Sequence, residues 1–277
     1  MLNPSPYRTI AAASTFSPRF RSVLAEAKRI RDRFSSDLHL IYVGQRTDET
    51  NAKFSEVFHE LGLPLDSTIH YEQGDAADSI LRVVNNQKVD MIVAGALEKE
   101  VVLHPFLGNV ARRLVREAGC SVMLFTHPEM EPKPLRRIVF VADDSYSSHA
   151  REALQSTFRL AAGESCERLY VVRIVTRFDE ARASLQSESN ADEKPKTSDD
   201  EEAALENFVL SAGATEVPVE ARCVRGNTGF AAADFVQSVD ADLLAVAVPL
   251  PVGGESSLPP NIAWLTDVIP CNLWVIR

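Results

Sequence analysis

A connection between a predicted strand and a predicted helix is the part of this sequence best suited to bind a ligand. Gly95 and Gly108 lie at its two ends, after the apolar run 91–94 and before a helix that we expect to begin at Asn109. Glycine lets a backbone approach a ligand closely, and a helix N-terminus presents free N–H groups at the positive end of its dipole. This combination is typical of a phosphate-binding loop.

The elements that would position this loop occur twice in the chain. Three residues of the first half recur at one constant spacing in the second half: Gly74, Asp90 and Asn109 correspond to Gly226, Asp242 and Asn261. The beginnings of the halves also match, Thr15 with Asp143, but at a shorter spacing. The second half therefore holds extra residues, and most of them must lie in 177–203. Because that segment is polar and charged, we expect a mobile insertion there.

Each half alternates short apolar runs with segments of helical periodicity, and the connections are short. This pattern predicts an α/β fold of two repeated domains, each a five-stranded parallel sheet with helices on both faces. We place the domains at 1–130 and 135–277, joined by a linker that contains three prolines. Ligands of such sheets lie beyond the carboxyl ends of the strands. Thr15 and Asp143, at the end of the first strand of each half, are therefore candidate ligand contacts.

Taken together, these stretches resemble the universal stress proteins, as a tandem of two such domains. The segments that carry the resemblance are TIAAASTFSP, GDAADSIL, VDMIVAG and LGNVARRLV in the first half, and RIVFVADDS, VDADLLAVAV and NIAWLTDVIPCNLWVI in the second. The resemblance implies an adenine-nucleotide alpha hydrolase-like fold. For ATP-binding members it also implies an aspartate at the end of strand one, on the adenine side. In those ATP-binding members, a loop of the pattern Gly-x2-Gly-x9-Gly-Ser/Thr holds the ribose and phosphates.

The first half keeps only part of that pattern. Gly95 and Gly108 are present, but Thr15 replaces the aspartate, Glu98 the middle glycine and Asn109 the serine or threonine. Glu98 adds a negative charge where a phosphate would lie, and like charges repel. Asn109 is a good helix cap, so a structural role alone would account for it.

The second half keeps the aspartate and loses the loop. Asp143 is present, whereas the four loop positions hold Ala247, Leu250, Pro260 and Asn261. Proline has no backbone N–H to offer a phosphate. Both nucleotide loops are therefore degenerate, the second more than the first.

Two charged clusters have alternative interpretations. The basic patch Arg112, Arg113 and Arg116 could face a phosphate or an acidic partner, or it could be an exposed helix face. The acidic run 199–202 could bind a cation, or it could be a solvated helix start, where carboxylates favour the positive end of the dipole.

Composition excludes several classes of function. A net charge of −10 and a pI of about 5.2 argue against nucleic acid and anionic membranes as partners. No apolar run approaches the roughly 20 residues that span a bilayer, so we expect a cytoplasmic protein that is not membrane-inserted.

The six histidines have no metal-site spacing and no catalytic nucleophile motif is present. We therefore expect no metal site and no enzyme activity.

The expected function is that of a tandem universal stress protein that responds to stress by protein contact or ligand sensing, with no cofactor. One alternative is a stress protein that binds ATP or AMP and hydrolyses ATP slowly, using the first domain. Another is a regulatory module of a membrane transporter. The identity of a protein partner stays open.

The two halves are also expected to pair with each other as an internal pseudo-dimer. Their final strands, 121–125 and 273–276, are apolar on both faces, and such an edge left open invites aggregation. We expect Val122–Leu124 to pair with Leu273–Val275, which would bury Trp274.

Overall fold

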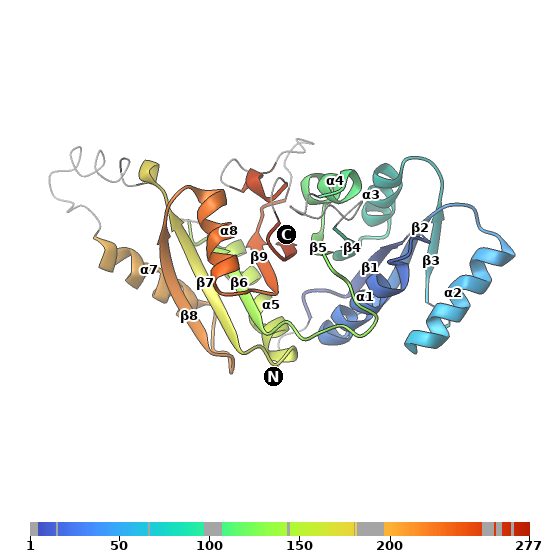
Figure 1. Ribbon diagram of the computed structural model, residues 1–277, viewed down its shortest axis with the longest axis horizontal. Helices are drawn as coiled ribbons and strands as arrows, with labels where there is room; N and C mark the ends of the chain where they lie inside the picture. Colours follow the sequence, from blue (N-terminus) through green and yellow to red (C-terminus); the bar gives the residue numbers. More distant parts are fainter. Residues whose placement is uncertain are drawn as a thin grey trace. The chain divides into compact units, whose positions relative to one another are not determined.

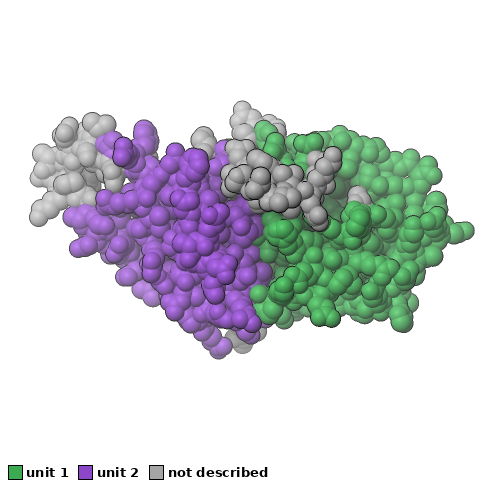
Figure 2. All heavy atoms as spheres, in the orientation of Figure 1, with its two compact units in different colours: residues 1–134, 250–258, 272–277 green, residues 135–249, 259–271 purple. Residues whose placement is uncertain are grey.

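The computed structural model describes residues 5–14, 16–65, 67–96, 107–142, 145–179, 181, 197–250, 258, 262–266 and 269–277 (Figure 1). The chain forms two compact units (Figure 2). Unit 1 comprises Met1–Pro134, Leu250–Leu258 and Asn272–Arg277, and unit 2 comprises Leu135–Pro249 and Pro259–Cys271. None of the described helices is long and apolar enough to cross a membrane.

Unit 1 contains a six-stranded sheet in the order β3-β2-β1-β4-β5-β10. All its strand pairs are parallel except β5 with β10, which is antiparallel. Its elements are β1 (Thr9–Ser14), α1 (Phe20–Phe34), β2 (Asp37–Val43), α2 (Asp48–Leu61), β3 (Ile69–Glu72), α3 (Ala76–Asn86), β4 (Met91–Gly95), α4 (Asn109–Glu117), β5 (Ser121–Phe125) and β10 (Asn272–Ile276).

Unit 2 contains four parallel strands in the order β9-β6-β7-β8. Its elements are β6 (Arg137–Ala142), α5 (Ser148–Gly163), β7 (Arg168–Val175), α7 (Ser198–Ser211), β8 (Val219–Arg225), α8 (Thr228–Ser238), β9 (Leu243–Ala247) and the 3₁₀ helix η1 (Ala263–Thr266). The α/β class with two repeated, mostly parallel halves is confirmed.

Strand β10 is the last strand of the second repeat, yet it completes the sheet of unit 1. Trp274 lies opposite Met123 of β5, with the neighbouring residues paired in the expected register. The indole of Trp274 is fully buried and its ring centre lies 6.0 Å from that of Tyr7 and 5.9 Å from that of Phe34. The predicted pairing of the two final strands is confirmed.

The segment 177–203 differs from the expected loop at its C-terminal end. Helix α7 begins at Ser198, and Thr197 caps it: the Thr197 hydroxyl accepts from the N–H of Asp200 at 3.2 Å, and the Asp200 carboxylate accepts from the N–H of Thr197 at 2.8 Å. Asp199, Asp200 and Glu201 of the acidic run lie in the first turn, so its interpretation as a helix start is confirmed. The prediction of a loop as far as residue 203 is wrong there, and it is also wrong at 177–179 and 181, which are helical. Residues 180 and 182–196 lie outside the described residues.

Candidate functional site

One backbone hydrogen bond joins the two ends of the candidate loop, and a second joins its start to the end of β5. The N–H of Gly108 donates to the carbonyl of Ala96 at 3.0 Å, and the N–H of Ala96 donates to the carbonyl of Phe125 at 2.9 Å. The loop therefore starts and ends at the carboxyl ends of β4 and β5, where ligands of this fold class bind. Residues 97–106, Glu98 included, lie outside the described residues.

Packing against the neighbouring helix does not by itself require glycine at the end of β4. A Cβ added to Gly95 would lie 3.4 Å from Cγ2 of Val23 in α1, at the edge of ordinary van der Waals contact. The glycine at this position is thus compatible with close approach by a ligand, and its binding role stays a prediction.

The N-cap of helix α4 lies one residue before the residue that the sequence suggests. Gly108 is the N-cap, and its carbonyl accepts from the N–H of Arg112 at 2.9 Å. Asn109 is already helical and exposed, and no side chain caps the helix. The prediction that Asn109 caps α4 is wrong, because the extended backbone of Gly108 already occupies the N-cap position. A glycine cap supplies no side-chain acceptor for the first N–H groups of the helix.

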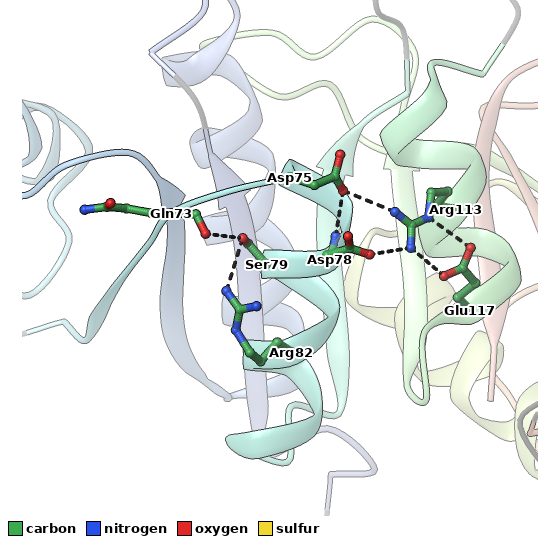
Figure 3. A network of polar contacts seen from close by, with 7 residues as sticks. All are labelled: Gln73, Asp75, Asp78, Ser79, Arg82, Arg113 and Glu117. Atoms are coloured by element: carbon green, nitrogen blue, oxygen red, sulfur yellow. Dashed lines mark hydrogen bonds and ion pairs between the residues drawn. The ribbon is translucent and has the colours of Figure 1, made fainter.

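The central arginine of the basic patch is occupied by carboxylates of its own unit (Figure 3). The guanidinium of Arg113 lies 3.1 Å from Asp75 and 2.7 Å from Asp78 at the start of α3, and 2.9 Å from Glu117 of α4. The hydrogen bond from Arg113 lowers the pKa of Glu117, and bonds to Glu117 and Asp78 raise the pKa of Arg113. Arg113 therefore ties α4 to α3 instead of facing a phosphate.

Arg112 and Arg116 have different surroundings. Arg116 is exposed on the outer face of α4. Arg112 is half-buried one turn from the Gly108 cap, and its Nε is buried with no hydrogen-bond partner in the described part of the chain. Arg112 is thus the cation of this patch that is best placed to meet an anion. The sequence marks the three arginines as one patch and contains no signal that separates them, because helix rotation decides which one is buried.

The corresponding region of unit 2 has a different structure. Where unit 1 has the nine-residue helix α4, unit 2 has the four-residue 3₁₀ helix η1. Trp264 of η1 packs on Gly229 of α8 so closely that a Cβ on that glycine would lie 2.9 Å from the Cβ of Trp264. A short 3₁₀ turn offers fewer aligned N–H groups than an α-helix. Asp143, Pro260 and Asn261 lie outside the described residues.

An aromatic cluster that sequence patterns did not single out lies at the carboxyl end of β2. Thr15 is outside the described residues, but Phe16 beside it packs on Tyr42 of β2 and Phe54 of α2, with ring centres 4.9 and 5.0 Å apart. Lys53 lies 5.2 Å from the centre of the Phe16 ring. This cluster borders the place where the first strand ends, and only tertiary structure brings its members together.

Unit 2 carries a second cluster in the equivalent place. Tyr146 stacks on Phe208 of α7 with ring centres 4.9 Å apart, and the guanidinium of Arg173 lies 5.9 Å from the Tyr146 ring centre. Desolvation is the main reason why the pKa of Tyr146 is raised. Unit 2 thus has a cation where unit 1 has the ring of Tyr42, so the two strand-end sites are chemically different.

Two repeated α/β units with mostly parallel strands define a tandem α/β protein. The family model of the universal stress protein family matches residues 45–126 and 134–248. The chain belongs to the universal stress protein family.

Solved structures agree on the fold. A protein of unknown function from Pseudomonas aeruginosa PAO1 superposes with a TM-score of 0.69 at 16% identity, over 98% of this chain and 92% of that one. A universal stress protein from Archaeoglobus fulgidus DSM 4304 superposes with a TM-score of 0.66 at 13% identity, over 99% of this chain and 98% of that one. No curated protein matches the chain.

Proposed function

We propose that this chain is a cytoplasmic stress-response protein that works by protein contact or ligand sensing, without catalysis. The observation that carries the proposal is the state of the two helices that would receive a phosphate. In the described part of unit 2 one of them is the 3₁₀ helix η1, and the other, α4, has its central arginine bound to three carboxylates.

The charges around helix α4 of unit 1 disfavour the binding of highly charged anions. Asp75, Asp78 and Glu117 surround the single guanidinium of Arg113, so their combined charge exceeds that of the arginine. Glu98 adds a further negative charge to the loop. These carboxylates are partly exposed, so solvent screens them, but they still oppose a triphosphate more than a neutral ligand. A neutral or singly charged ligand suits this site better than ATP.

A second candidate function is binding of ATP or AMP by unit 1, and one observation favours it. Helix α4 starts at a glycine with no side-chain cap, and the Nε of Arg112 has no hydrogen-bond partner among the described residues. Both features leave donors for an anion at one helix end. The transporter alternative stays a prediction, and stoichiometric copurification of a membrane protein, absent from a control pull-down, would support it.

Calorimetric titration of ATP and AMP into the purified chain separates the two candidates. The proposal expects no saturable binding in the micromolar range and no phosphate release above the blank. Arg112→Gln is the diagnostic variant, and Arg116→Gln, on the exposed side of the same helix, is the matched control. Micromolar binding that Arg112→Gln abolishes and Arg116→Gln preserves would overturn the proposal in favour of nucleotide binding. Release of phosphate by the wild type would overturn its non-catalytic part.

A further inference from the structure

Two histidines that are far apart in the sequence meet on the outer strands of unit 1. His39 lies on β2 and His70 on the edge strand β3, which is parallel to it. The Nε2 of His70 lies 3.2 Å from the Nδ1 of His39, and the ring centres are 5.2 Å apart at an angle of 45°. Both side chains are half-buried.

Strand geometry places both rings on the same face of the sheet. Tyr42 and Tyr71 both contact Phe54 of α2, on the opposite face. Because successive side chains of a strand alternate between faces, His39 and His70 lie on the face against which α3 packs. The pair is therefore fixed by two backbones in register and does not depend on a loop.

We propose that His39 and His70 bind a divalent transition-metal ion, such as Zn²⁺, through these two nitrogens, with water completing the coordination. Zinc–nitrogen bonds are about 2.0–2.1 Å long, so two ligands of one tetrahedral ion lie roughly 3.3 Å apart. The sheet already holds the two nitrogens at nearly this distance. Imidazole is a preferred ligand of Zn²⁺, Cu²⁺ and Ni²⁺.

The protonation state of both rings suits this role. Burial is the main cause that lowers the pKa of His39, and burial together with the charge of His39 lowers the pKa of His70. The lowered pKa values favour neutral rings, and a metal ligand must be neutral imidazole. One of the two facing nitrogens carries the proton of the hydrogen bond, so binding requires that ring to carry its proton on its other nitrogen. Two bonds to the ion then replace the hydrogen bond between the rings.

The surroundings limit the site to two protein ligands. Glu72 lies on the same face of β3, but its carboxylate is bound to Arg82 of α3 at 2.6 Å. No group of three or more metal-binding side chains occurs among the described residues. The ion is thus held more weakly than in a four-ligand structural site, and it exchanges with the solution.

Titration of Zn²⁺ into the full, tag-free chain tests the proposal. We expect one saturable site per chain in calorimetry, and a loss of affinity of at least about tenfold in His39→Gln and in His70→Gln, because each leaves a single ligand. His59→Gln, at an exposed histidine of α2, is the matched control and should bind like the wild type. Electron paramagnetic resonance of the Cu²⁺ complex should report two nitrogen ligands in the wild type and one in each variant.

Wild-type affinity in both variants, or a single nitrogen ligand in the wild type, would overturn the assignment. A loss of affinity in His59→Gln would do the same. Circular dichroism monitors folding, and if His39→Gln on the inner strand does not fold, His70→Gln on the edge strand decides the matter by itself.

Discussion

Replacement of Trp274 measures how much unit 1 depends on β10. The indole has no exposed surface, lies opposite Met123 of β5 and packs on the rings of Tyr7 and Phe34. Its Nε1 is buried and has no hydrogen-bond partner in the part of the chain that the structure describes. Two opposing effects therefore act at one position: burial of a large ring stabilises unit 1, and burial of an unpaired N–H destabilises it.

The two effects predict different costs for two substitutions. Trp274→Ala removes the ring and leaves a cavity among buried neighbours, which should cost about 3–5 kcal/mol of unfolding free energy. Trp274→Phe keeps most of the ring packing and removes the unpaired N–H, whose burial costs about 1–3 kcal/mol. The free energy recovered by removing the unpaired N–H offsets much of the stability lost with the smaller apolar surface. We therefore expect Trp274→Phe to cost no more than about 1.5 kcal/mol.

Urea unfolding followed by far-ultraviolet circular dichroism measures both costs without relying on tryptophan fluorescence. Phe230→Ala is the control, because this aromatic side chain is 74% exposed and its loss should change the free energy by less than about 0.5 kcal/mol. A cost below about 1 kcal/mol for Trp274→Ala would refute the assignment of β10 to the core of unit 1. A cost well above about 1.5 kcal/mol for Trp274→Phe would refute the role given to the indole N–H.

Three further predictions follow from single contacts. Gly226→Ala should lower the Tm, because a Cβ there would lie 2.9 Å from the Cβ of Ala231 and φ is 155°; an unchanged Tm would contradict this. Burial raises the pKa of Cys120 to about 12, so its thiol should react with an alkylating reagent at pH 8 far more slowly in the native chain than in urea, as mass spectrometry of the labelled peptide would report. Arg113→Met should lower the Tm at neutral pH. The pKa of Glu117 is lowered in the folded state, so this ion pair stabilises the protein above the ordinary glutamate pKa. The stabilisation is lost as the pH falls through the lowered pKa of Glu117, and the Tm difference between variant and wild type should therefore shrink towards about pH 3. A Tm difference that stays constant with pH would mean that charge pairing is not the cause.

Local signals in the sequence located the elements around the candidate loop well. The predicted limits of α4 and β5, Asn109–Glu117 and Ser121–Phe125, agree with the structure, because glycines and an apolar run mark them. The pairing of β5 with β10 was also predictable, since both strands are apolar on both faces and need cover. Repetition predicts most of the other elements, because each half indicates the order of elements in the other. The exception is η1, which lies where the second half should have a counterpart of α4.

Side-chain partners were not predictable in the same way. The cap of α4 at Gly108 depends on one backbone conformation, and the partners of Arg113 depend on how α4 is rotated against α3. His39 and His70 meet only because β2 and β3 are neighbours in a particular register. Such contacts arise from long-range packing, and no pattern within a window of ten or fifteen residues contains them.

The position of β10 in unit 1 has a consequence for synthesis on the ribosome. Strand β5 is translated about 150 residues before β10, and at 5–20 residues per second the delay is roughly 7–30 s. During that interval the apolar edge of β5 has no β10 to pair with, even if β1 to β5 have already folded. Nascent chains are thus exposed to edge-to-edge association during this interval, when a chaperone or slow translation would have its greatest effect on yield.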